Sequence, residues 1–125
     1  HPGIELWHKR TLSQLMQTRC VANKFGYRRF YFDRIDSILP EALAWVPQST
    51  VACVINQALA KIAVELPEVD VLLQVHDSLA GQFPTSKPHL AQEITKRGHI
   101  LILYDDPLII PCGIKLSEKS WGDCK

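Results

Sequence analysis

The residues best suited to chemistry are His76 and Asp77, which stand side by side after an apolar segment. That segment, residues 69–75, is rich in β-branched and apolar side chains, so we expect it to form a buried strand. A carboxylate at the end of a buried strand is costly unless a cation or a positioned base pairs with it. A strand also holds its terminal side chains rigidly, which suits a metal-ligating carboxylate. The pair therefore predicts a metal-binding or acid–base site.

Two neighbouring elements are expected to position this pair. Residues 78–83 have the pattern of a returning strand, which puts His76 and Asp77 at or near a hairpin turn. A long helix precedes the hairpin and stops at Pro67, and Pro47 must either kink it or begin its main portion. Its predicted buried stripe consists of Val51, Ile55, Leu59, Ile62 and Leu66. We expect this stripe to pack under the hairpin.

The other elements combine helices and short strands without a regular βαβ alternation. We expect a first helix over residues 4–22, a short strand or extended arm over 27–32, a helix capped by Ser86 that runs to Arg97, and two final strands over 99–104 and 108–116 separated by a turn at 105–107. The predicted fold class is α+β. At 125 residues the chain fits a single domain, residues 1–125.

Positive charge is concentrated near the N-terminus. Seven of the 14 Lys and Arg residues fall within the first 34 positions, where only Glu5 and Asp33 oppose them. A solvated helix face would explain this pattern. A surface that follows a phosphate backbone would explain it equally well, because Lys and Arg supply most nucleic-acid affinity. The seven residues are Lys9, Arg10, Arg19, Lys24, Arg28, Arg29 and Arg34.

Composition and cysteine spacing exclude some classes of protein. Hydrophobic residues make up 46% of the chain and charged residues 22%, which is typical of a soluble globular protein. No apolar run approaches the ~20 residues that span a bilayer, so we expect no membrane partner. Four scattered cysteines without a C-x-x-C pair argue against zinc and predict reduced thiols in a cytoplasmic protein. The start at His1 suggests a segment of something longer.

Five segments in the right order resemble family A DNA polymerases, the group of bacterial DNA polymerase I and many phage replicases. A Gln-Val-His-Asp string that ends a strand resembles their motif C. The other matches are His1-Pro2-Gly3-Ile4 with Trp7, Phe25-Gly26-Tyr27-Arg28-Arg29, Pro47-Gln48-Ser49-Thr50-Val51-Ala52, and Ile110-Pro111 through Trp121. The resemblance implies a phage-type palm segment that follows the fingers, with long helices on a small antiparallel sheet.

The resemblance also implies roles for individual residues. Asp77 would be one of two palm carboxylates that hold paired Mg²⁺ ions ~3.5–4 Å apart during nucleotidyl transfer. His76 would contact the primer terminus, and Gln48 would reach the minor groove of the nascent duplex. Arg28 and Arg29 would contact backbone phosphate, which positions a duplex without reading its sequence. Lys9, Arg10 and Lys24 would add to this primer-template contact.

Three departures from the family pattern limit what this chain could do. Ser78 stands where motif C usually has Glu, and Pro40 and Ala44 stand where the family has Arg and Asn. Motif A, with the other metal-binding Asp, and motif B, which holds the incoming dNTP, would both precede His1. We therefore expect the chain alone to be inactive and to need an upstream polymerase segment. Its compartment would be the host cytoplasm if a phage encodes it.

Two other functions compete with the polymerase hypothesis. A non-catalytic DNA-binding module would use the basic N-terminal part and no metal. A metal-dependent phosphohydrolase would use His76 and Asp77, but it would require further His ligands, and His8, His89 and His99 show no recognisable spacing.

Overall fold

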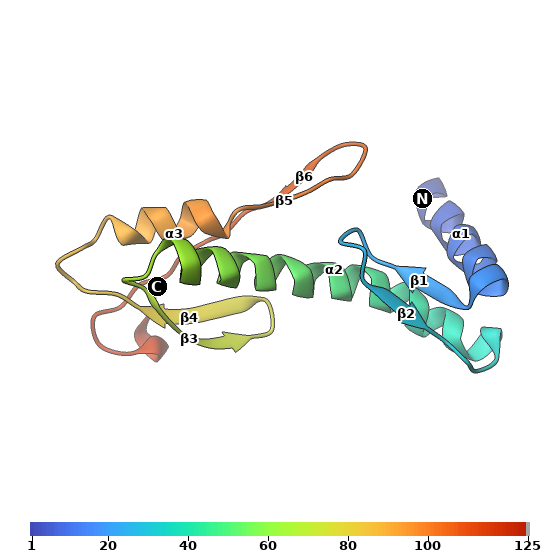
Figure 1. Cartoon of the computed structure of the whole chain (residues 1–125), viewed down its shortest axis with the longest axis horizontal. Helices are drawn as coiled ribbons and strands as arrows, with labels where there is room; N and C mark the ends of the chain where they lie inside the picture. Colours follow the sequence, from blue (N-terminus) through green and yellow to red (C-terminus); the bar gives the residue numbers. More distant parts are fainter. Residues whose placement is uncertain (125) are drawn as a thin grey trace. The chain divides into compact units, whose positions relative to one another are not determined.

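The fold is a mixed α+β arrangement of helices and small antiparallel sheets. The computed structural model describes residues 1–124, which form three α-helices, three two-stranded sheets and a terminal 3₁₀ turn (Figure 1). The α+β prediction is confirmed at this level. In chain order the elements are α1 (Pro2–Thr18), β1 (Cys20–Ala22), β2 (Arg28–Phe30), α2 (Ile35–Glu65), β3 (Asp70–Val75), β4 (Ser78–Gln82), α3 (Leu90–Gly98), β5 (Ile100–Ile102), β6 (Leu108–Ile110) and η1 (Trp121–Asp123).

The chain divides into two compact units, and α2 runs through both. The first unit covers residues 1–51 and the second begins at Ala52. The first therefore holds α1, the β1–β2 hairpin and the start of α2, whereas the second holds the rest of α2 and all later elements. The organisation as one domain stays a prediction.

In the first unit, α1 ends earlier than the sequence pattern indicated. Arg19 adopts a left-handed conformation with φ 56°, and its N–H donates to the carbonyl of Leu15 at 3.0 Å. This C-cap closes the helix after Thr18. Residues 20–22, predicted to be helical, instead form strand β1, which pairs with β2. The helix prediction was wrong there because an arginine, and not the following Asn or Gly, takes the positive φ.

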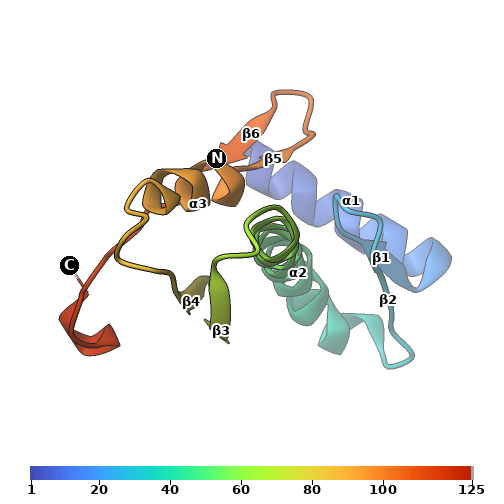
Figure 2. The ribbon, with the colours of Figure 1, turned by 60° about the vertical axis from the view of Figure 1, so that its left-hand side comes forward.

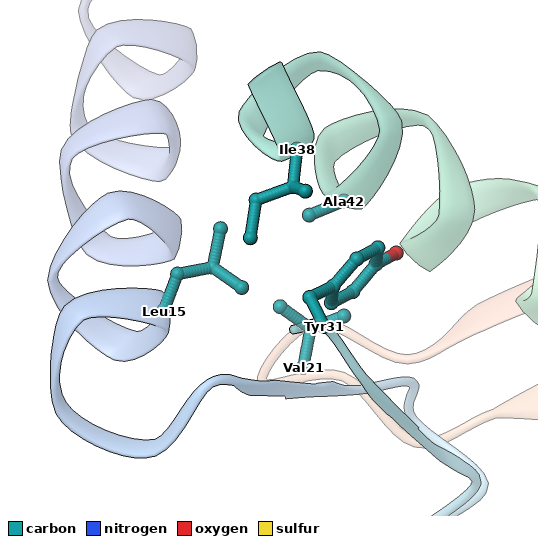
Figure 3. Packing of buried hydrophobic residues seen from close by; sticks show 5 residues of the cluster. All are labelled: Leu15, Val21, Tyr31, Ile38 and Ala42. Carbon is teal, nitrogen blue, oxygen red and sulfur yellow. The ribbon is translucent and has the colours of Figure 1, made fainter. Parts of the chain in front are cut away.

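The core of the first unit forms where α1, the β1–β2 hairpin and the start of α2 meet. Figure 3 shows Leu15, Val21, Tyr31, Ile38 and Ala42 pointing toward one another, and each is buried. Tyr31 belongs to this cluster, yet its buried hydroxyl has no hydrogen-bond partner within residues 1–124. Burial raises the pKa of Tyr31 above its ordinary value, and the nearby Arg29 opposes that rise.

In the second unit the C-terminal end of α2 packs against the β3–β4 hairpin. Ile62, Leu66 and Val69 are buried together with Leu90, and Val71 and Leu79 from the two strands pack against them. This contact confirms that the helix lies against the hairpin. The buried line on α2 is shifted from the predicted stripe: it contains Val54, Ala58, Ile62 and Leu66, whereas Val51 is half exposed and Ile55 and Leu59 are only partly buried.

The prediction of a buried strand before His76 was wrong. Leu72 is 63% exposed and Leu73 is 46% exposed, so most of β3 does not lie in the core. Only Val71 and Val75 within the strand are partly buried. The apolar run therefore forms the predicted strand but contributes little to the core of its own unit.

Helix α3 and the β5–β6 hairpin complete the second unit. The helix begins at Leu90 after the N-cap His89, so the predicted cap at Ser86 was wrong. Arg97 of α3 forms ion pairs with Glu93 and, at 2.9 Å, with Glu65 near the end of α2. Gly98 closes the helix so near to Cys112 that a methyl group in its place would collide with that side chain. Burial also raises the pKa of the Cys112 thiol.

Helix α2 is long and apolar enough to cross a membrane by length and composition, the one such helix within residues 1–124. The expectation of no membrane partner stays a prediction. Core helices of proteins without a membrane pass the same test, so the finding is weak evidence of a span. Only 22% of its most apolar 18-residue window is buried in the structure.

Candidate functional site

His76 and Asp77 form the entire two-residue loop of the β3–β4 hairpin. Val75 pairs with Ser78 across the turn, and the two strands lie side by side in both views (Figure 1 and Figure 2). The hydroxyl of Ser78 donates to the carbonyl of Val75 at 2.8 Å and closes the turn further. The predicted hairpin with Asp77 at its tip is confirmed.

His76 occupies a backbone conformation that its side chain disfavours. Its φ is 52°, and Arg19 is the only other non-glycine residue described that has a positive φ. Two-residue hairpin loops need a positive φ at their first position and for that reason favour Gly, Asn or Asp there. A Cβ in this region costs about 1–2 kcal/mol. Strain of this kind persists most often at functional sites, where the side chain itself is needed.

Both residues of this loop are exposed to solvent. The argument that a buried carboxylate must be neutralised therefore does not apply to Asp77. Among the described residues, no hydrogen bond or ion pair to its carboxylate is found. An exposed carboxylate on a rigid two-strand support can accept a ligand, such as a cation, that is brought from outside the chain.

The chain offers only part of a metal site. No group of three or more His, Cys, Asp or Glu side chains within residues 1–124 is placed to hold a metal ion. Mg²⁺ prefers octahedral oxygen ligands and is bound through one or two carboxylates with waters and substrate phosphates. Asp77 fits the role of one such ligand, and the described residues do not complete the set.

A second candidate surface lies on the β1–β2 hairpin, where the two adjacent arginines behave differently. Arg29 forms an ion pair with Glu41 of α2, and its guanidinium lies over the Tyr31 ring, 5.2 Å from the centroid. Arg28 is exposed, and no partner for its guanidinium is found in the described part of the chain. Adjacent residues of a strand point to opposite faces, so the two side chains cannot contact one phosphate together.

The remaining residues predicted to contact DNA are exposed and belong to the first unit. Lys9 and Arg10 lie on α1, Lys24 lies in the β1–β2 turn, and Gln48 lies on α2. The structure brings Lys24 and Arg28 onto the same hairpin. His76 and Asp77 belong to the second unit.

The sequence pattern did not identify Asn23 as the residue that holds the turn of the β1–β2 hairpin in place. Asn23 is buried, and its Oδ1 accepts from the backbone N–H groups of Phe25 at 3.0 Å and Tyr27 at 3.1 Å. Its Nδ2 donates to the hydroxyl of Ser49 on α2 at 3.1 Å. An asparagine three residues before Gly26 is a typical turn signal, and it stands directly after the segment predicted to be the first helix.

Comparison with known proteins adds no assignment: no family model, no curated protein and no solved structure matches the chain.

Proposed function

We propose that this chain is the C-terminal palm portion of a polymerase similar to the family A DNA polymerases. The observation that supports this most directly is the two-residue turn made of His76 and Asp77, with His76 held at φ 52°. A glycine would form this turn at lower cost. A histidine followed by an exposed carboxylate at the tip of a hairpin is the arrangement expected of motif C.

In this proposal the complete enzyme adds nucleotides to a DNA 3′-end under the direction of a template. Asp77 would be one ligand of the Mg²⁺ ions, which neutralise charge on the reacting phosphoryl group. His76 would orient the primer terminus, and Gln48 would contact the minor groove of the product duplex. One carboxylate cannot by itself complete the ligand set of a two-metal site, so the isolated chain would be inactive without an upstream segment.

Exposed apolar side chains in the second unit support the need for such a segment. Three leucine or valine side chains are largely exposed and a fourth, Leu73 on β3, is nearly half exposed; the three are Leu72 on β3, Val64 on α2 and Leu103 after β5. Exposed apolar side chains gain free energy when a partner covers them, so residues of this kind suit a protein interface. In the proposed enzyme, the upstream polymerase segment would cover part of this surface and would supply motifs A and B.

A metal titration on the chain itself tests the role of Asp77. Mn²⁺ binds carboxylates as Mg²⁺ does, and it broadens the NMR signals of nearby nuclei. With primer-template DNA present, we expect broadening centred on residues 76–78, and we expect Asp77→Asn to remove it. Asp70→Asn is the matched control, because Asp70 is an exposed carboxylate at the other end of the same hairpin. Equal broadening at both ends would contradict the proposal.

A second candidate function, a non-catalytic DNA-binding module, is favoured by the basic N-terminal surface. Residues 1–34 carry seven basic and two acidic side chains, 7 − 2 = +5. Arg28 is available to a phosphate, whereas Arg29 already pairs with Glu41. Such a module would bind duplex DNA without sequence preference, and its affinity would fall steeply with added salt because counterions are released.

The two arginines distinguish this module from a merely solvated basic face. Arg28→Ala should lower the affinity for duplex DNA and reduce the salt slope by about one counterion. Arg29→Ala should change affinity less, because its charge is already balanced by Glu41. Fluorescence anisotropy at several salt concentrations measures both effects. A flat salt response in the unaltered chain would rule out the DNA-binding module.

A further inference from the structure

One face of the β1–β2 hairpin combines a guanidinium with two aromatic rings. Tyr31 points into the core of the first unit, as Figure 3 shows. Side chains alternate along an extended chain, so Phe30 and Phe32 point away from that core, together with Arg28. The extended chain continues past β2, because the Tyr31 N–H donates to the carbonyl of Arg19 at 2.8 Å. We call Arg28, Phe30 and Phe32 the aromatic face.

The rings of the aromatic face are unusually accessible. Phe30 is 57% exposed and Phe32 is 91% exposed. Each phenylalanine would gain free energy by leaving water, and neither contributes to the cores described above. A single exposed ring needs no explanation, but two rings at alternate positions beside an exposed arginine form a surface with a defined chemistry.

The charge around this face favours a polyanion over an apolar protein partner. The first 34 residues carry a net charge of 7 − 2 = +5, and Lys24 and Arg28 both lie on this hairpin. Protein interfaces also bury aromatic rings and arginine, but they are depleted of lysine, and a net positive surface is better matched by a chain of phosphates. Duplex DNA hides the faces of its bases within the stack, so exposed rings would gain nothing from it. Unpaired bases can stack on such rings while basic side chains follow the phosphates.

We propose that the aromatic face binds single-stranded nucleic acid, with unpaired bases stacked on Phe30 and Phe32 and a phosphate held by Arg28. Residues two apart on a strand are separated by ~6.6 Å. This is about twice the ~3.4 Å rise between stacked bases, which leaves each ring space for its own base. Stacking uses the π-face that every base has, so the site should tolerate any sequence.

This site does not depend on the polymerase proposal. It uses neither His76 nor Asp77, and a chain without catalytic activity could carry it. The chain could therefore bind Mn²⁺ at Asp77 without binding single strands, or bind single strands without binding Mn²⁺ at Asp77. The two experiments distinguish these outcomes.

Anisotropy titrations with three labelled probes test the aromatic face. The probes are a 12-mer of thymidine, a 12-mer of abasic residues with the same phosphates, and a blunt duplex hairpin. The unaltered chain should bind the thymidine 12-mer more tightly than the abasic one. Phe30→Ala and Phe32→Ala should each weaken thymidine 12-mer binding at least about fivefold and leave abasic binding unchanged. Arg28→Ala should weaken both 12-mers.

Two further variants keep the test specific to stacking. Trp121→Ala removes an exposed aromatic side chain of similar accessibility from the second unit, and should change nothing. Phe30→Leu keeps an apolar side chain but loses the π-face, so it should behave like Phe30→Ala. Circular dichroism melts confirm that each variant is folded. Equal affinity of the unaltered chain for thymidine and abasic 12-mers would overturn the proposal and leave a protein-docking surface as the explanation.

Discussion

The turns of the β1–β2 and β3–β4 hairpins each contain one residue with a positive φ, but the two residues are of opposite kinds. In β1–β2 a glycine, Gly26, takes the positive φ of 85°, and the buried Asn23 satisfies the backbone of the turn. In β3–β4 the positive φ falls on His76, and the loop contains no glycine. The first turn follows local folding preferences, and the second departs from them.

Under the proposed function, the first turn stabilises its unit and the second turn displays the residues that act in chemistry. The Asn23 side chain ties the β1–β2 turn to Ser49 of α2 and so helps to hold the unit together. The β3–β4 turn leaves both of its side chains in solvent. A sequence that accepts backbone strain to display two polar side chains is consistent with a functional tip.

The largest effect is expected from Asp77→Asn in an enzyme reconstituted with the proposed upstream segment. The substitution keeps the shape of the side chain and removes the charge that attracts Mg²⁺, so nucleotide addition should fall at least about a hundredfold. Duplex affinity should remain nearly unchanged, because basic side chains supply it. His76→Ala should be milder. Primer extension by Asp77→Asn at close to the normal rate would show that the second hairpin is only a turn.

A substantial loss of stability is expected from Asn23→Ala in the first hairpin. The substitution removes three hydrogen bonds from a buried side chain and leaves two backbone N–H groups unsatisfied, so the free energy of unfolding should fall by about 1–3 kcal/mol. Urea titration followed by circular dichroism measures the change. Ser78→Ala in the second hairpin is the control and should cost less than about 0.5 kcal/mol, because its one hydrogen bond is exposed. Equal losses would remove the contrast between the two turns.

A gain in stability is expected from His76→Gly. Glycine adopts the positive φ without a Cβ penalty but loses more entropy on folding, so the net gain should be about 0.5–1 kcal/mol. The matched control is Asp77→Gly, where φ is not positive and the entropy term alone should lower stability. Thermal melts of both variants give the comparison. Destabilisation by His76→Gly would mean that the histidine is not strained.

The smallest effect is expected from Tyr31→Phe, and it should be confined to the first unit. Removing a buried hydroxyl without a hydrogen-bond partner should raise the free energy of unfolding by up to about 1 kcal/mol. Burial raises the pKa of Tyr31 in the folded chain above the ordinary 10.0, so its ionisation costs no stability below pH 10.0 and lowers the free energy of unfolding as the pH rises through the folded value. Tyr31→Phe should abolish this alkaline loss. Urea midpoints measured between pH 8 and pH 11 test it.

Sequence patterns predicted the β3–β4 hairpin well. Two strand-like segments, residues 69–75 and 78–83, leave only residues 76–77 between them for the turn. They failed where one residue decided the outcome through its backbone. Arg19 ends α1 with a positive φ, a conformation that is uncommon for arginine and that the sequence therefore does not indicate. The predicted stripe on α2 was shifted from the observed buried face because that face includes Ala58. A small side chain such as alanine adds little to an apolar pattern, so the sequence favoured its larger neighbours.

Exposure was harder to predict than secondary structure. An apolar pair such as Leu72-Leu73 predicts buried side chains. Whether they are buried depends on which other segments pack against the strand, and the local sequence does not determine that. The same limit applies to the candidate sites. The pairing of Arg29 with Glu41 and the exposure of Phe30 follow from tertiary packing and have no local signal.

The close approach of Gly98 to Cys112 makes that thiol a natural chemical reporter. Thiolate, and not thiol, reacts with alkylating reagents, so the raised pKa of Cys112 slows its modification while the second unit is folded. Any opening that separates the end of α3 from the segment after β6 would expose the sulfur and lower its pKa toward the ordinary value. The rate of alkylation at Cys112, measured by mass spectrometry on the unaltered chain, therefore reports how often this part of the second unit opens.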